Sequence, residues 1–293
     1  MQDFRLKVFA YAARSLSFSR CAEQMMISQP AVSKHISELE TYFGKKLFFR
    51  KGTRLELTDA GQLLYKWTGI ILPLYEKMDY EMSLLDRTER GHLRVGASTT
   101  VAQYVLPAIL AKYHNMAPDV NVSLISGNSQ SVENMLFAGE IDLGFVENLS
   151  RRSGLKYYPF LSDKLVLVVG RGSNIPANIS VESLRNIPIV LRESGSGTLE
   201  MLQRRLDACG ISLASLKIVA KLGSTEAIKS YVSFSDACAV ISTAAIEDEL
   251  ACGDLRAVDV TGVDFSRQFM YVTCQGDKNP LVSRFVEFAK TNL

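Results

Sequence analysis

Apolar residues in the first sixty positions recur at the three- and four-residue spacing of amphipathic helices. The first such series is Leu6, Phe9, Ala10 and Ala13. A second helix is predicted over roughly residues 19–26, with Ser17 or Ser19 as its N-cap. The chain therefore begins with two short helices.

A third helix is predicted to begin after Ser28, a good N-cap, with Pro30 in the first turn where a missing N–H costs nothing. Its apolar face is Ala31, Val32, Ile36 and Leu39. The helix runs to Tyr42 or Phe43, and Gly44 ends it. Two short apolar runs follow at 47–50 and 55–57, and the turn between them predicts a small hairpin.

A long helical pattern extends from Thr58 to about Thr88. Its apolar positions are Ala60, Leu64, Trp67, Ile71, Leu74, Met78 and Leu85. A helix of this length spans roughly 45 Å. It carries more apolar surface than a lone helix leaves in water, so we expect it to pair with a second copy of the chain, burial against its own domain being the alternative. Pro73 should kink this helix or remove one hydrogen bond.

After Gly91 the pattern changes to strands that alternate with helices. The predicted strands are 92–98, 120–126, 142–147, 164–169, 188–192, 216–222, 238–242, 255–260 and 267–274. The predicted helices are 101–115, 130–138, 197–209, 225–233, 244–251 and 281–291. This alternation is typical of an α/β domain with mostly parallel strands, and its size favours two lobes.

Positive charge is concentrated at the start of the chain. Residues 1–66 hold eleven Lys/Arg and six Asp/Glu, a net charge of +5, whereas residues 91–293 carry −1. A modestly basic end suits a module that binds phosphates, and a random fluctuation of surface charge is the alternative.

Cysteine and histidine usage argues against disulfides and metals. The five cysteines have no CxxC spacing, and the three histidines are scattered. We therefore expect no cofactor and no metal. The start of the chain does not resemble a signal peptide and no apolar run reaches the length of a membrane span, so a cytoplasmic location without membrane contact is expected.

The second and third helices, joined by a tight turn, form the strongest candidate site. This arrangement places the start of the third helix at the major groove of DNA. Polar and turn residues there can contact bases or phosphates. The expected DNA-binding residues are Ser28, Gln29, Pro30, Ser33 and Lys34 on the helix, with Arg50, Lys51 and Arg54 on the hairpin. The alternative is a three-helix bundle with a merely solvated polar face.

Several strings in residues 9–61 closely resemble the winged helix-turn-helix of LysR-type transcriptional regulators. They are Ser-Gln-Pro-Ala-Val-Ser at 28–33, Leu-Glu at 39–40, Leu-Phe-Phe-Arg at 47–50 and Leu-Thr-Asp-Ala-Gly at 57–61. Cys21 departs from the usual alanine but is compatible with packing. The resemblance implies a homodimer formed through the long helix, often a dimer of dimers (a homotetramer). It also implies binding to an imperfect inverted repeat in promoter DNA, with RNA polymerase as a further partner.

The resemblance extends over the whole chain and implies its domains. Residues 1–58 are the expected winged helix-turn-helix, 59–90 the linker and dimerisation helix, and 91–293 an effector-binding domain. That domain is expected to have the α/β, two-lobed type 2 periplasmic-binding fold. Lobe one covers 91–163 and 268–293, and lobe two covers 164–267, with a hinge near 160–166 and 262–270.

Polar residues follow several predicted strands of this domain, where ligands of α/β sheets bind. Helix starts there offer free N–H groups and hydroxyls to an anion, although each serine or threonine alone is typical of an ordinary helix cap. The expected effector-binding residues are Ser98, Thr99, Thr100, Asn128, Ser129, Val146, Gly195, Ser196, Gly197, Thr198 and Thr225.

Four strings of the domain are Ala-Ser-Thr-Thr at 97–100, Tyr-Val-Leu-Pro at 104–107, Asp-Leu-Gly-Phe-Val-Glu at 142–147 and Glu-Ser-Gly-Ser-Gly-Thr at 193–198. They resemble the CysL-like branch of the family and, more loosely, its sulfur regulators. In the latter, hydroxyls matching Ser98, Thr100 and the loop around Ser196 hold a sulfate-like anion. Val101 and Val146 replace polar ligand contacts, which implies a partly apolar pocket. A small anion, linked to sulfur metabolism, is the expected effector.

Two other functional classes compete with a regulator. An enzyme on a periplasmic-binding-like fold would need a catalytic set, and we find no Ser-His-Asp, Cys-His or metal set. Glu147 and Glu193 form a conceivable carboxylate pair, but solvated or capping roles are favoured for both. A DNA-binding protein that ignores ligands would not explain the polar strand ends.

Overall fold

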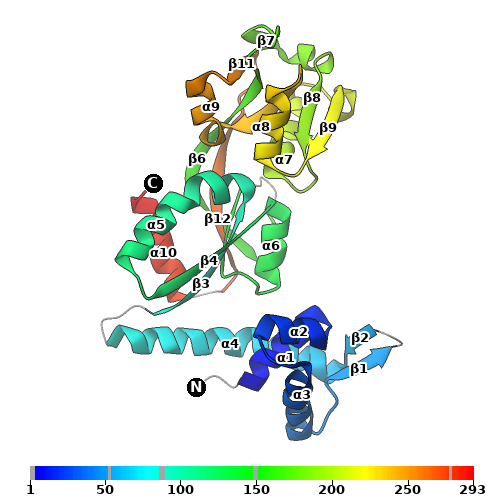
Figure 1. The fold of residues 1–293 in the computed structure, drawn as a ribbon, viewed down its shortest axis with the longest axis vertical. Coiled ribbons are helices and arrows are strands. Elements are labelled where there is room, and N and C mark those ends of the chain that lie inside the picture. Colours follow the sequence, from blue (N-terminus) through cyan, green and yellow to red (C-terminus); the bar gives the residue numbers. More distant parts are fainter. Residues whose placement is uncertain (1–3, 52–53, 86–89, 148–150, 277–278) are drawn as a thin grey trace. The chain divides into compact units, whose positions relative to one another are not determined.

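The computed structural model describes residues 4–51, 54–85, 90–147, 151–276 and 279–293. The chain divides into two compact units, Met1–Gly91 and His92–Leu293. Figure 1 labels the helices and strands of both units. No helix among the described residues is long and apolar enough to cross a membrane.

The first unit consists of three short helices, a hairpin and a long helix, as predicted. Its elements are α1 (Phe4–Ser15), α2 (Phe18–Met25), α3 (Gln29–Phe43), β1 (Phe48–Lys51), β2 (Arg54–Leu57) and α4 (Asp59–Leu85). Its core includes Phe9 from α1, Val32 and Ile36 from α3 and Leu47 before the hairpin. Of the two candidate caps for α2, the structure selects Ser17, whose side chain accepts a hydrogen bond from the Arg20 N–H.

Helix α4 continues through Pro73 without a break in its helical assignment. Since proline has no N–H, the carbonyl of Gly69 loses its usual helical donor. The predicted helix extended to residue 88, but residues 86–89 lie outside the described part. Large apolar side chains remain exposed along α4, and we call this set the α4 stripe. Its members are Leu63, Trp67, Ile70, Leu74, Met78, Met82 and Leu85.

The second unit is built on one ten-stranded sheet whose strand order is β4-β3-β5-β12-β6-β10-β8-β9, with β11 pairing with β6 and β7 with β11. The strands are β3 (Gly91–Ser98), β4 (Val120–Gly127), β5 (Leu143–Val146), β6 (Leu155–Gly170), β7 (Asn178–Ser180), β8 (Ile189–Arg192), β9 (Ile218–Leu222), β10 (Cys238–Ser242), β11 (Leu255–Thr261) and β12 (Ser266–Cys274). The helices are η1 (Val101–Val105), α5 (Leu106–Met116), α6 (Ser129–Phe137), η2 (Val181–Arg185), α7 (Gly197–Ala208), η3 (Leu213–Ser215), α8 (Thr225–Ser233), η4 (Thr243–Ala245), α9 (Glu247–Cys252) and α10 (Pro280–Thr291).

Strand β6 joins two halves of this sheet (Figure 1). Its first part, to Lys164, pairs with β12, and from Leu165 it pairs with β10. We therefore call residues 92–164 and 266–293 lobe one, and residues 165–265 lobe two. Both β6 and β12 run antiparallel to their neighbours. The expectation of mostly parallel strands was wrong for these two strands. Parallel neighbours are joined by βαβ units, whereas the direction of a strand that crosses between the lobes follows from the path of the chain.

Candidate functional site

The start of α3 presents the expected DNA-reading residues on its exposed side. Ser28, Gln29, Pro30 and Lys34 are exposed, and Ser33 is half-buried. Val32, Ile36 and Leu39 form the opposite, buried side. Because apolar residues fix one side of the helix in the core, the polar side is left to solvent and to a partner.

Local backbone geometry fixes how this helix begins. The Ser28 side chain accepts a hydrogen bond from the Ala31 N–H at 3.3 Å. Met26, two residues before Ser28, has a φ of 51°, and this left-handed conformation closes the turn after α2. Gln29 Nε2 donates to Ser33 Oγ at 3.3 Å, so two expected base-reading side chains form one unit.

The hairpin residues of the expected DNA interface are less fully described. Arg50 and Lys51 lie on β1 and Arg54 on β2, where Lys51 is paired with Arg54 in the strand register. Their side chains lie outside the described part of the structure, and their role stays a prediction.

In the second unit, the end of β3 carries a buried hydroxyl. Ser98 is 2% exposed, and its Oγ has no hydrogen-bond partner. Thr99 is half-buried and Thr100 is buried just beyond it. Strand β5 runs parallel beside β3, with Ala97 opposite Phe145, so both strands end at the same edge. Unpaired buried hydroxyls are rare and call for a ligand or a water.

The starts of α6 and α7 meet across the two lobes. The Gln130 N–H donates to the Gly195 carbonyl at 3.2 Å, and Asn128 Nδ2 donates to the Ser194 carbonyl at 3.3 Å. Gly195 has φ of 86°, and a Cβ there would lie 2.7 Å from Gln130 Oε1. The glycine at this position is therefore required both by its backbone and by the close approach of lobe one.

Buried Arg192, at the end of β8, was missed by the sequence reasoning. Its Nη2 donates to Thr99 Oγ1 at 2.9 Å and its Nη1 to Thr225 Oγ1 at 3.3 Å, which links three polar segments. Its Nε also donates to Glu193 at 2.9 Å. The arginine that ends the apolar run Ile-Val-Leu at 189–191 was the available signal, because a charge at the end of a buried strand lies at the ligand-binding edge.

A second buried arginine, Arg267 on β12, was also missed. Its Nε donates to Asp163 at 2.6 Å and its Nη1 to Thr198 Oγ1 at 3.0 Å, and Nη1 lies 3.5 Å from Glu147. Ser129 Oγ donates to the same Glu147 at 3.1 Å. No periodicity singled out Arg267, because it lies between polar Ser266 and Gln268 on its strand.

Two sequence expectations need correction here. Glu147 is not solvated: it is 2% exposed and lies against Arg267 and Ser129, while Glu193 pairs with Arg192. The conceivable carboxylate pair is thus divided between two arginines. Val146 is an expected effector contact, but it packs in the apolar core of lobe one with Met270. Successive residues of a strand face opposite sides, so Val146 and Glu147 point apart.

The charges of this interlobe site are largely compensated within it. Burial disfavours the ionised form of Glu193, but the hydrogen bond and charge of Arg192 outweigh it and lower the pKa of that carboxyl. Arg267 is likewise opposed by Asp163 and Glu147. An anion held here would therefore depend on hydroxyls and on backbone N–H groups at helix starts.

The other expected effector residues gather around this site. Ser196 is the N-cap of α7, and Gly197 and Thr198 are buried in its first turn. Thr225 begins α8 and contacts Arg192. Groups of three or more His, Cys, Asp or Glu that could hold a metal do not occur among the described residues.

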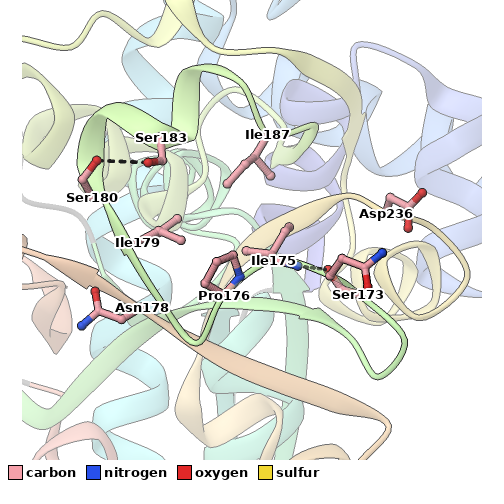
Figure 2. A pocket seen from close by; sticks show the side chains of 10 residues that line it. Ser173, Ile175, Pro176, Asn178, Ile179, Ser180, Ser183, Ile187 and Asp236 are labelled. Carbon is pink, nitrogen blue, oxygen red and sulfur yellow. Dashed lines mark hydrogen bonds between the residues drawn. The ribbon is translucent and has the colours of Figure 1, made fainter.

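A separate hollow of about 550 Å³ lies in lobe two (Figure 2). Among its lining residues, Ile187 precedes β8 and Asp236 precedes β10. The hollow is therefore at the amino ends of these strands, opposite to the edge that holds Arg192. Ligands of α/β sheets bind at the carboxyl ends, so we do not place the effector there.

Comparison with known proteins gave two family matches and several relatives. The family described as "LysR substrate binding domain" matches residues 86–293. The family described as "Bacterial regulatory helix-turn-helix protein, lysR family" matches residues 4–62.

Two relatives match most of the chain. The "Uncharacterized HTH-type transcriptional regulator YeiE" of Escherichia coli K12 is 34% identical over 87% of this chain and 85% of its own. The "HTH-type transcriptional regulator CysL" of Bacillus subtilis is 27% identical over 98% of this chain and 96% of its own. Among solved structures, the Synechocystis CcmR regulatory domain in complex with 2-PG is 25% identical. It covers 68% of this chain and 96% of its own, with a TM-score of 0.63.

Proposed function

Because this chain belongs to the LysR family of bacterial transcriptional regulators, we propose that a small anion bound between the two lobes of its second unit controls its binding to promoter DNA. The chain is a regulator with an effector-binding domain and not an enzyme. The site, the class of the effector and the DNA site are the proposal.

One observation carries the effector proposal: the buried Ser98 hydroxyl that has no partner. Leaving a polar group unpaired in the interior costs about 1–3 kcal/mol, and an oxygen of a bound anion removes this cost. Helices α6, α7 and α8 begin at the same edge with Asn128, Ser196 and Ser224 as N-caps. Their first N–H groups supply further donors.

The resemblance to the CysL-like branch supports oxyanions of sulfur metabolism as the first ligands to test. The positive charges of Arg192 and Arg267 are already balanced by carboxylates. The anion would therefore be held by hydroxyl and backbone N–H groups, whose spacing favours a small ligand. The 2-PG bound to the CcmR domain supports a small molecule at this type of domain.

A thermal-shift panel tests the effector proposal directly. The panel contains sulfate, sulfite, thiosulfate, phosphate, nitrate and acetate. An anion at a hundred times its dissociation constant stabilises the folded domain by about 2.7 kcal/mol. Ser98→Ala, and Ser196→Ala combined with Thr100→Ala, should abolish this shift, whereas exposed Ser162→Ala should keep it. An equal shift in all variants would place the anion elsewhere.

For DNA, we propose an imperfect inverted repeat near the chain's own gene, bound by a homodimer or a dimer of dimers. The purified protein should retard the intergenic fragment beside its gene more strongly than random DNA of equal length. Retardation should weaken steeply with salt, because phosphate contacts release counterions. Equal retardation of both fragments would contradict a specific regulator.

A further inference from the structure

One turn of π-helix follows β3 directly, over Val101–Val105. Single π-helical turns are rare and are frequent at functional sites. Tyr104 lies within this turn in lobe one, yet its ring packs against an apolar cluster of lobe two that includes Val190 and Ile228. The turn therefore brings a lobe-one side chain onto the other lobe.

The Tyr104 hydroxyl donates a hydrogen bond to Glu226 Oε1 on α8. The same carboxylate oxygen lies 2.8 Å from Lys229 Nζ, and Lys229 Nζ lies 2.5 Å from Glu249 Oε1 on α9. The ammonium group also donates to the Ala245 carbonyl at 3.0 Å. It lies 5.3 Å from the centre of the Tyr104 ring, within range of a cation–π contact.

Three of these four side chains, Glu226, Lys229 and Glu249, belong to lobe two. Lys229 pairs with Glu226 and Glu249 within lobe two, and the three side chains form a cradle for the tyrosine. Tyr104 alone would lose its acceptor, its cation–π contact and its apolar contacts if the lobes separated. A contact of this kind can be made and broken as a unit when two lobes close and open about a hinge.

The cradle lies next to the proposed effector site. Glu226 directly follows Thr225, which contacts Arg192, and Tyr104 lies one helical turn after Thr100. When Tyr104 rests on lobe two, the Thr99–Arg192 contact across the lobes is also made. The cradle and the site therefore lie on the same pair of facing lobe surfaces.

We propose that Tyr104 is a positioning residue that clasps lobe one onto the Glu226–Lys229–Glu249 cradle and holds the effector site closed. The part concerning the effector rests on the proposed function. The clasp lowers the rate at which the lobes open, and so lowers the rate at which a bound anion leaves.

Hydrogen–deuterium exchange of the full-length protein without effector tests the clasp itself. Tyr104→Phe keeps the ring and removes one hydrogen bond to a charged group. Exchange should rise about three- to tenfold in both 101–105 and 225–233, which lie in different lobes. Tyr158→Phe is the matched control, because Tyr158 stacks on Tyr271 within lobe one. A rise confined to 101–105, or equal in the control, would overturn the clasp.

Glu226→Ala provides the reciprocal test from lobe two. It should raise exchange in 101–105 to a similar degree, and the double variant with Tyr104→Phe should add little, because both remove the same contact. Full additivity of the two changes would show that the residues do not act together.

The effector arm uses inorganic sulfate as its probe. Tyr104→Phe should raise the dissociation rate of sulfate several-fold with a smaller change in the association rate. If sulfate leaves both proteins at one rate, the clasp does not control the site. If sulfate fails to bind the parent, the anion proposal is at fault, and the exchange measurement still decides the clasp.

Discussion

At the residue scale, a hydrogen bond couples Gln29 and Ser33, two residues of the proposed DNA-reading side of α3. Gln29→Ala or Ser33→Ala should each weaken specific binding by about 1–3 kcal/mol. Since each side chain orients the other, the double variant should cost less than the sum. Fluorescence anisotropy with the operator fragment measures this, and exposed Gln203→Ala in the second unit should bind like the parent. Parent-like binding by both single variants would mean that the recognition residues are misassigned.

The ion pair of Glu193 with Arg192 should make the stability of the folded protein depend on pH in the acid range. Burial disfavours its charge, but Arg192 outweighs burial and holds the pKa of Glu193 below its ordinary value of 4.5. The carboxyl in the folded protein therefore stays ionised at pH values where the unfolded one takes up a proton. Its contribution to the free energy of unfolding is complete above about pH 4.5 and is lost as the pH falls below that value. Glu193→Gln should flatten the fall of the unfolding midpoint as the pH is lowered below about 4.5, while Glu182→Gln, at an exposed site, should not. If the Glu193→Gln variant lost stability with acid to the same degree as the parent does, the Arg192–Glu193 pair would not stabilise the fold.

At the scale of elements, the turn between α2 and α3 contains a strained residue. Met26 adopts φ of 51° and is 92% exposed, so its side chain adds no core packing. The left-handed conformation costs a non-glycine residue about 1–2 kcal/mol. Met26→Gly should therefore raise the unfolding free energy of the first unit by about 0.5–1 kcal/mol, after the entropy of glycine in the unfolded chain is subtracted.

Chemical denaturation followed by circular dichroism measures this change. Lys66→Gly is the contrasting variant, because Lys66 is an exposed residue inside the long helix α4, where glycine should destabilise by about 1 kcal/mol. If Met26→Gly destabilised to the same degree, the turn would not be strained as described.

The α4 stripe is the expected surface of self-association. LysR-type regulators associate with themselves, and an exposed apolar stripe on a long helix is the surface that such association buries. Leu74→Glu would bury a carboxylate in that contact, and sedimentation velocity should show dissociation toward monomer. Lys66→Glu makes the same new side chain at an exposed polar position and should leave the assembly intact. Assembly unaffected by Leu74→Glu would assign the contact to another surface.

At the scale of the whole molecule, the two units have separate cores. Phe9 and Ile36 belong to the core of the first unit, whereas Leu167 and Leu206 belong to one in lobe two. Calorimetry should therefore show two transitions, and an anion that binds the second unit should raise only one of them. Ser98→Ala should remove that rise and leave the other transition in place. A single transition that moves as a whole would mean that the units unfold together.

The structure of the first unit follows closely from its own residues, because its signals are local. Ser28 and Gly44 fix the ends of α3, and the spacing of Val32, Ile36 and Leu39 fixes its buried side. These are effects of neighbouring residues on one turn of helix, and they do not depend on the rest of the chain. The strand ends near Ser98 and Thr225 were predicted for the same reason.

Which charges are buried, and which groups they contact, depends instead on segments that are far apart in the chain. Arg192 reaches Thr99 across 93 positions of sequence, Arg267 reaches Asp163 across 104, and Tyr104 reaches Glu226 across 122. Strand β6 became one long crossing strand because β12 lies beside it, which its own residues do not specify. Whether a side chain is solvated depends on what packs over it, and that is settled when distant segments meet.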